Sequence, residues 1–200
     1  MTVSLVEAVG AVQAIGRAEL ETETLEACRA GDPKALRRFV VRYQPVVFAY
    51  LSRTLGPGSH VEDLAQEVFL RAFRAVARFA PEGPARASTW LLTIATRVAI
   101  DARKRKRVPT DPFPDDGGPI DPNTPETERQ RFEMRRRLGR ALGELAPELR
   151  DAYILAEFHG LTMAEMAEVL GIGLNTAKAR LWRARERLRL LLGPWWEGRC

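Results

Sequence analysis

The stretch STWLLTIATRVAIDARKRKR, residues 88–107, carries the pattern on which the rest of the chain depends. Its apolar residues recur at three- and four-residue spacing, which is typical of one buried helix face. Ser88 is a suitable N-cap, because its hydroxyl can accept a hydrogen bond from an unpaired backbone N–H of the first turn. The stretch ends in five consecutive cations, Arg103 to Arg107. Two interpretations are open: a core helix with a solvated tail, and a helix whose outer surface holds nucleic acid.

The outer face of this helix is aromatic and polar. At about 100° per residue, Trp90, Thr93, Arg97 and Lys104 fall away from the apolar stripe. Aromatic stacking combined with backbone charge is how proteins capture separated strands. The alternative is that Trp90 is buried against the preceding helix.

Composition favours a globular protein that binds polyanions. A chain of 200 residues forms one or two domains, and its 46% hydrophobic content supports real cores. The net charge is +5, but residues 109–128 contain six acids and no Lys or Arg. The cations therefore lie on both sides of this segment, which predicts two separate polyanion-binding surfaces.

The same composition argues against several classes of protein. Cys28 and Cys200 are isolated, which suggests a reducing compartment and no disulfide framework. No apolar run is long enough to span a membrane, and the N-terminus lacks the cationic start of a secretory signal. His60 and His159 are too few and too isolated for a zinc centre. We therefore expect a cytoplasmic protein without membrane insertion, metal or cofactor.

Residues 61–79, VEDLAQEVFLRAFRAVARF, form the clearest amphipathic helix. Leu70 lies in the middle of its polar face, among Asp63, Gln66 and Glu67. A single exposed Leu is common on protein surfaces. A Leu surrounded by acids and amides is also what a docking site for a cationic helix looks like.

A proline-rich acidic segment separates two helical parts. Residues 109–125 hold six prolines and few core-forming residues, so this segment should be extended or flexible. We expect an all-α fold of two small helical domains, with Pro45 bending or interrupting a helix of the first. The expected units are an N-terminal extension (1–21), the first domain (22–107), a linker (108–130), the second domain (131–192) and a C-terminal tail (193–200).

The second domain carries a helix-turn-helix pattern. Thr162 and Glu165 form a capping box that opens a short helix, and Gly171-Ile172-Gly173 makes a tight turn. A longer helix follows from about Asn175 to Leu192, with six cations and one acid between residues 178 and 189. A short helix, a glycine turn and a cationic second helix predict DNA binding. The alternative, a helical hairpin with a solvated basic face, explains fewer of these features.

These segments resemble an extracytoplasmic-function (ECF) sigma factor, the two-domain group of the bacterial sigma-70 family. DLAQEVFLRAFRAVARF (63–79) is similar to sigma region 2.2, and residues 88–107 are similar to regions 2.3 and 2.4. LTMAEMAEVLGIGLNTAKARLWRARERLR (161–189) is similar to region 4.2. The resemblance covers most of residues 22–192 in the family's order and spacing.

The resemblance implies a promoter-directing transcription initiation factor that is not an enzyme. Region 2 would bind the β′ clamp helices of core RNA polymerase and open the −10 element. Region 4 would read the −35 element as duplex and touch the β flap, and an anti-sigma factor would hold the protein inactive. The candidate polymerase-binding residues are Asp63, Gln66, Glu67 and Leu70. The candidate −10 residues are Trp90, Thr93, Arg97, Arg103, Lys104 and Arg105. The candidate −35 residues are Asn175, Thr176, Lys178, Arg180, Trp182, Arg183 and Arg187.

Two segments of the chain depart from the family pattern. Arg97 stands where the family usually has Asn, which puts a family-style contact to an unpaired base in doubt. In region 4.2 the usual Gly-Thr-Val-Lys-Ser-Arg reads NTAKAR at residues 175–180, so Ala179 lacks the Ser hydroxyl. We therefore expect a different −35 preference.

Two other classes of protein compete with this interpretation. A stand-alone helix-turn-helix regulator would leave the face around Leu70 and the helix of Trp90 unexplained. A nucleic-acid enzyme needs converging carboxylates for metal ions, or a nucleophile with cationic neighbours. The densest acids of this chain lie in the expected linker, which cannot preorganise a site.

Overall fold

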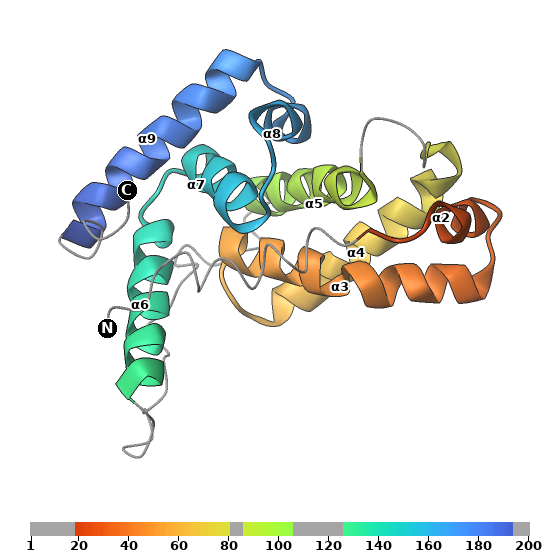
Figure 1. Cartoon of the computed structure of the whole chain (residues 1–200), viewed down its shortest axis with the longest axis horizontal. Coiled ribbons are helices and arrows are strands. Elements are labelled where there is room, and N and C mark those ends of the chain that lie inside the picture. Colours follow the sequence, from red (N-terminus) through yellow and green to blue (C-terminus); the bar gives the residue numbers. More distant parts are fainter. Residues whose placement is uncertain (1–18, 81–85, 106–125, 194–200) are drawn as a thin grey trace.

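The computed structural model describes residues 19–80, 86–105 and 126–193, and every regular element within them is a helix. Figure 1 shows two groups of helices, which confirms the all-α prediction. The N-terminal bundle comprises α2 (Thr22–Arg29), α3 (Pro33–Leu55), α4 (Ser59–Ala75), the 3-10 turn η1 (Val76–Arg78) and α5 (Ala87–Lys104). The C-terminal bundle comprises α6 (Glu126–Gly143), α7 (Pro147–Tyr153), the π-helical turn η2 (Ile154–Phe158), α8 (Met163–Leu170) and α9 (Leu174–Leu192).

Helix α3 is the long central element of the N-terminal bundle and packs against α2, α4 and α5. It begins where Asp32 accepts a hydrogen bond from the Lys34 N–H at 2.9 Å. Of the two effects expected at Pro45, a bend or an interruption, the interruption is wrong, because α3 continues through Pro45 to Leu55. Pro45 is exposed, as is Val41 one turn earlier. Water can therefore solvate the Val41 carbonyl that proline leaves without a donor.

The start of α5 differs from the expectation. Ser88 is not the N-cap: that position is Arg86, and Ser88 is buried inside the first turn. The Ser88 hydroxyl donates to Oε1 of Glu19, and the Ser88 N–H donates to Oε2 at 3.3 Å. Tyr43 of α3 also donates to Oε2, at 2.6 Å. A carboxylate before α2 thus pairs with the first turn of α5, where the helix dipole favours negative charge.

The C-terminal bundle contains the expected helix-turn-helix. Thr162 and Glu165 form the predicted capping box, with the Thr162 N–H donating to Oε2 at 2.8 Å. Gly171 ends α8 in the left-handed conformation, at φ 64°. α6 begins at Glu126, before the expected start of the second domain, so residues 126–130 of the expected linker are helical. Residues 1–18, 81–85, 106–125 and 194–200 lie outside the described residues. These ranges contain most of the expected extension, the linker up to residue 125 and most of the expected tail.

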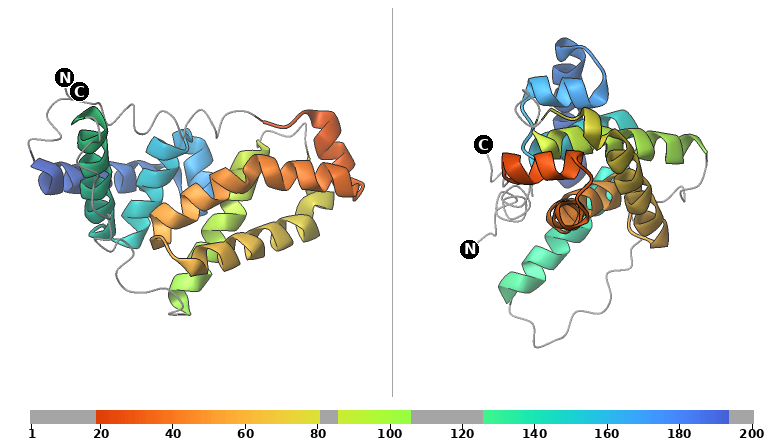
Figure 2. Two further views of the ribbon diagram at one scale, coloured as in Figure 1. Left: turned by 90° about the horizontal axis from the view of Figure 1, so that it is seen from below. Right: turned by 90° about the vertical axis from the view of Figure 1, so that its right-hand side faces the viewer.

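The two bundles pack directly on one another. Figures 1 and 2 show the C-terminal bundle against one end of the N-terminal bundle, with α8 beside α5. The end of α3 meets α7 and η2, and the buried apolar residues of both bundles form one continuous cluster. Nothing in the local sequence pattern predicted this arrangement.

Candidate polymerase and nucleic-acid interfaces

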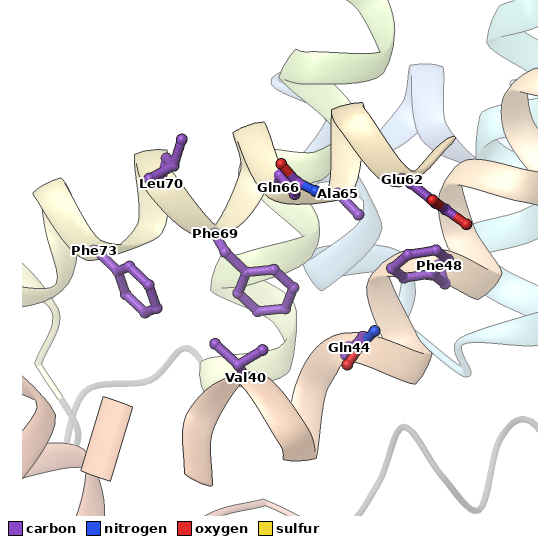
Figure 3. Close-up of a pocket in the computed structure, with 9 residues that line it drawn as sticks. All are labelled: Val40, Gln44, Phe48, Glu62, Ala65, Gln66, Phe69, Leu70 and Phe73. Carbon is purple, nitrogen blue, oxygen red and sulfur yellow. The ribbon is translucent and has the colours of Figure 1, made fainter. Parts of the chain in front are cut away.

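The exposed face of α4 borders an apolar groove. Leu70 is 56% exposed, as the pattern predicted, and Asp63 and Gln66 are exposed too. The groove has a volume of about 560 Å³ and lies between α3 and α4. Figure 3 shows Phe69 and Phe73 turned toward α3, with Leu70 pointing away from it. The groove is lined by Val40, Gln44, Phe48, Glu62, Ala65, Gln66, Phe69, Leu70 and Phe73.

Glu67, the fourth predicted polymerase-binding residue, is part of an ion-pair network. Arg71 contacts the Glu67 carboxylate at 2.6 Å and the Asp101 carboxylate of α5 at 3.2 Å. The network therefore ties α4 to α5. Asp63 and Gln66 flank Leu70 and form no ion pair within the described part of the chain, so they are better placed than Glu67 to face a partner.

Trp90 is half-buried on α5. Its ring centroid lies 4.9 Å from that of Phe79 and 6.4 Å from that of Phe39. The two interpretations of Trp90 are therefore not exclusive, since one part of the ring packs in the core and another part meets solvent. Thr93 is also half-buried, and its hydroxyl donates to the Thr89 carbonyl at 3.1 Å.

The cations predicted for the −10 surface do not lie together. Arg97, Lys104 and Arg105 are exposed. Arg103 instead faces the C-terminal bundle, and both its terminal nitrogens donate to Asp151 of α7, at 3.0 and 2.6 Å. Burial raises the pKa of Asp151, and the Arg103 guanidinium offsets part of this rise. Nothing in the local sequence marks Asp151, a lone acid, as the partner of a distant cation.

The outer face of α9 presents the predicted −35 residues to solvent. Its inner stripe is buried, and consists of Ala177, Leu181, Ala184, Leu188 and Leu192. Trp182 is 64% exposed on the opposite side. Two other cations of α9 form ion pairs within the C-terminal bundle, Arg185 with Glu157 and Arg189 with Glu186. The exposed candidates are Asn175, Thr176, Lys178, Trp182, Arg183 and Arg187, and Arg180 is half-buried.

Comparison with known proteins shows the family of the chain that carries these surfaces. The family model for Sigma-70 region 2 matches residues 39–108, and that for Sigma-70 region 4 matches residues 135–188. The RNA polymerase sigma-H factor of Pseudomonas aeruginosa is 30% identical over 186 residues, covering 88% of this chain and 95% of the relative. The chain belongs to the sigma-70 family. The ECF RNA polymerase sigma-E factor of Escherichia coli K12 is 32% identical, over 82% of this chain and 90% of the relative. CarQ, a sigma factor of Myxococcus xanthus, is also 32% identical, over 84% and 95%.

Solved structures show the same fold. CnrH in complex with the cytosolic domain of CnrY has a TM-score of 0.62 at 24% identity, and covers 86% of this sigma factor and 96% of that chain. The sigma factor RpoE of Bartonella quintana, in complex with the anti-sigma factor NepR, has a TM-score of 0.60 at 24% identity, covering 80% and 98%.

This ECF sigma factor is a promoter-directing transcription initiation factor rather than a stand-alone regulator. The sigma-70 family consists of non-enzymatic transcription factors. Among the described helices, none is both long and apolar enough to cross a membrane. The described residues also contain no group of three or more His, Cys, Asp or Glu side chains arranged to hold a metal ion.

Proposed function

We propose that the α4 face containing Asp63, Gln66, Glu67 and Leu70 binds the β′ clamp helices of core RNA polymerase. The observation that supports this is an exposed Leu70 at the rim of an apolar groove. An exposed apolar side chain that becomes buried on binding, with acids around it, complements a cationic helical partner, and charge complementarity speeds and orients docking.

We propose that α5 holds the −10 element with Trp90, Thr93, Arg97, Arg103, Lys104 and Arg105. The exposed part of the Trp90 ring would stack on an unpaired base, and each stacked base contributes about 1–3 kcal/mol. Arg97, Lys104 and Arg105 are exposed along the same helix toward its C-terminus, where duplex phosphates would enter. Arg103 joins them only when it is released from Asp151.

We propose that α9 reads the −35 element as duplex with Asn175, Thr176, Lys178, Arg180, Trp182, Arg183 and Arg187. A recognition helix needs one face packed on its own domain and the other open to the major groove. α9 has this division: the stripe containing Ala177 and Leu181 is buried, and Lys178 and Arg183 are exposed. The same bundle would touch the β flap.

We further infer the setting in which the protein works. It acts in the cytoplasm, without catalysing a reaction, and an anti-sigma factor binds it. The functional units are residues 22–107 for polymerase and −10 binding, 131–192 for −35 binding, and the linker 108–130. The Bartonella structure supports the anti-sigma partner, since its sigma factor shares this fold and is bound to NepR.

One observation carries the proposal: the same chain exposes both the Leu70 face of α4 and the cationic face of α9. Run-off transcription with purified core polymerase and genomic promoter fragments tests it. We expect discrete transcripts only when core and the sigma factor are both present. Footprints on promoter DNA without any dependence on core would instead favour a stand-alone regulator.

A further inference from the structure

An ion pair ties the second half of α9 to the turn η2. The Arg185 guanidinium donates from Nε and Nη2 to the same Glu157 oxygen, at 3.0 and 2.6 Å. The two residues are 28 positions apart in the sequence. The side chain of Arg185 is 50% exposed and that of Glu157 is 30% exposed, so the pair lies at the surface of the C-terminal bundle.

Glu157 reaches α9 from a π-helical turn. η2 continues α7, which packs against α9, and Glu157 is the only acid in this turn. A hydrogen bond from the His159 N–H to the Ile154 carbonyl, at 3.2 Å, joins residues five positions apart rather than four. The wider turn directs its side chains differently from an uninterrupted α-helix, and turns of this kind are frequent at functional sites. Here the irregular turn presents a carboxylate to the recognition helix.

Arg185 lies where a recognition helix meets the DNA backbone. It follows Lys178 by seven residues, about two helical turns, so both side chains lie on nearly the same side of α9. Lys178 and Trp182, which lies between them, are exposed on the proposed reading face. A recognition helix contacts base edges with its N-terminal residues. Cations in its second half therefore lie close to the phosphates, which Arg and Lys side chains commonly contact.

The Glu157 carboxylate neutralises the charge that Arg185 would bring to these phosphates. Each phosphate that a cation neutralises releases counterions, and this release supplies the sequence-independent part of DNA affinity. A guanidinium that is already paired with a carboxylate brings no net charge, and the carboxylate itself repels phosphate. The pair between Arg185 and Glu157 therefore removes one cation from those that α9 can offer to DNA.

We propose that Glu157 withholds Arg185 from DNA phosphates and so limits the affinity of α9 for DNA of any sequence. The proposal rests on the proposed role of α9 as the −35 reader. It gives a residue outside the recognition helix a part in DNA affinity. Such a limit matters because a genome offers about 10⁶–10⁹ non-specific sites that compete with each promoter.

Replacing the carboxylate by its neutral amide tests the proposal in the full-length chain. Glu157→Gln keeps the side-chain size and frees Arg185. Glu168→Gln is the matched control, because Glu168 is an exposed acid on α8 of the same bundle and forms no ion pair within the described residues. Both variants lose one negative charge, and only the first releases a cation. Pairs between exposed side chains contribute little to stability, so both variants should fold, which circular dichroism checks.

Fluorescence anisotropy measures the affinity of each chain for two short DNA duplexes of equal length. One duplex is selected from a randomised pool by the wild-type chain, and the other is a shuffled sequence of the same composition. Glu157→Gln should steepen the slope of log affinity against log salt by about 0.9, the value for one added phosphate contact. Its gain over Glu168→Gln should therefore shrink by about 3.5-fold between about 50 and 200 mM salt, equally on both duplexes.

The double variant Glu157→Gln/Arg185→Gln identifies the released cation. Its salt slope should return to the wild-type value, since Arg185 neutralises no phosphate in the wild type. A slope that stays steep in the double variant overturns the proposal, because another cation then supplies the contact. A salt slope for Glu157→Gln equal to that of Glu168→Gln overturns it as well.

Comparison of the two duplexes separates this role from two other outcomes. If Glu157→Gln weakens binding to the selected duplex alone, the pair aligns α9 for base reading and the proposal is overturned. If selection enriches no sequence, the −35 reading by α9 is wrong for the free chain. The salt slope on the shuffled duplex then still decides whether Glu157 withholds Arg185.

Discussion

The Trp90 ring of α5 lies 4.9 Å from the Phe79 ring, centroid to centroid, at an interplanar angle of 35°. This contact holds the indole against Phe79, the residue after η1, and Trp90 remains partly exposed to solvent. Trp90→Ala should therefore lose both core packing and stacking, whereas Trp90→Phe keeps most of the packing. Because each stacked base contributes about 1–3 kcal/mol, we expect Trp90→Ala to bind promoter DNA with core but open it poorly.

Permanganate reactivity of unpaired thymines measures this opening, and thermal unfolding measures the packing loss. Removal of a buried aromatic side chain costs about 3–5 kcal/mol, so a half-buried Trp90 should cost less. Trp90→Phe serves as the control for packing. Normal thymine reactivity in a folded Trp90→Ala protein would remove Trp90 from the opening step.

Leu70→Arg should weaken binding of core polymerase. The change removes an apolar anchor and places a cation opposite a basic partner, and hot-spot substitutions of this kind cost about 2 kcal/mol or more. Val41→Arg is the matched control, since Val41 is 68% exposed on α3 and does not line the groove. Pull-down of core polymerase by each folded variant makes the comparison. Equal retention of core by the two variants would contradict the docking assignment.

Arg183→Ala and Arg187→Ala should affect DNA binding in different ways. Arg183 is exposed near Trp182 on the proposed reading face, whereas Arg187 lies one turn further along α9. A base-directed arginine contributes about 1–3 kcal/mol of discrimination, while a phosphate contact mainly sets the salt dependence. Footprinting across variant −35 sequences should show altered preference for Arg183→Ala and uniform weakening for Arg187→Ala. Identical profiles would abolish this division of roles.

Glu19→Ala should destabilise the N-terminal bundle. The Glu19 carboxylate accepts from the Ser88 hydroxyl and N–H and from Tyr43, so its removal leaves buried donors unpaired. Such a loss costs about 1–3 kcal/mol. A double-mutant cycle of Glu19→Ala with Ser88→Ala, followed by thermal unfolding, should show a non-additive pair. Glu21→Ala is the control, since Glu21 is exposed. Additive effects of Glu19→Ala and Ser88→Ala would show that the contact contributes little.

The packed arrangement should lose stability in mild acid because of His159. This residue is buried, and neither ring nitrogen has a hydrogen-bond partner among the described residues. Burial, and then the charge of Arg53 on α3, lower the pKa of His159 from 6.5 to about 3. Below pH 6.5 the unfolded or separated form therefore binds a proton that the packed form excludes, and stability falls as the pH falls toward 3.

At pH 5 this difference amounts to about 2 kcal/mol, from 1.36 kcal/mol per pKa unit. Thermal unfolding of the full chain between pH 7.5 and pH 5 should show the loss, and His159→Phe should remove most of it while keeping a ring against Tyr50. His60→Phe is the control, since His60 is the other histidine of the chain and is half-buried in the N-terminal bundle. The same acid dependence in His159→Phe as in the wild type would assign the effect to other groups.

The sequence by itself determined the features that depend on neighbours within one or two helical turns. The apolar stripes of α4 and α9, the exposed Leu70, the capping box at Thr162 and the turn that starts at Gly171 all follow from local spacing, because helix period and capping are local properties. The order of these segments was also sufficient to indicate the family. The remaining features depend on contacts between residues that are far apart in the sequence.

Only the tertiary structure showed that Glu19, rather than Ser88, supplies the oxygens at the start of α5. The two residues are 69 positions apart, and a carboxylate can reach any donor that packing brings near it. Arg103 likewise belongs to a run of five cations that look equivalent in the sequence. The structure describes three of them, Arg103, Lys104 and Arg105. Of these three, Arg103 alone pairs with Asp151, which is 48 positions away. Attraction between charges depends on their distance in space and leaves no periodic pattern in the sequence. The packing of the two bundles therefore decides which of these cations pairs with a buried carboxylate.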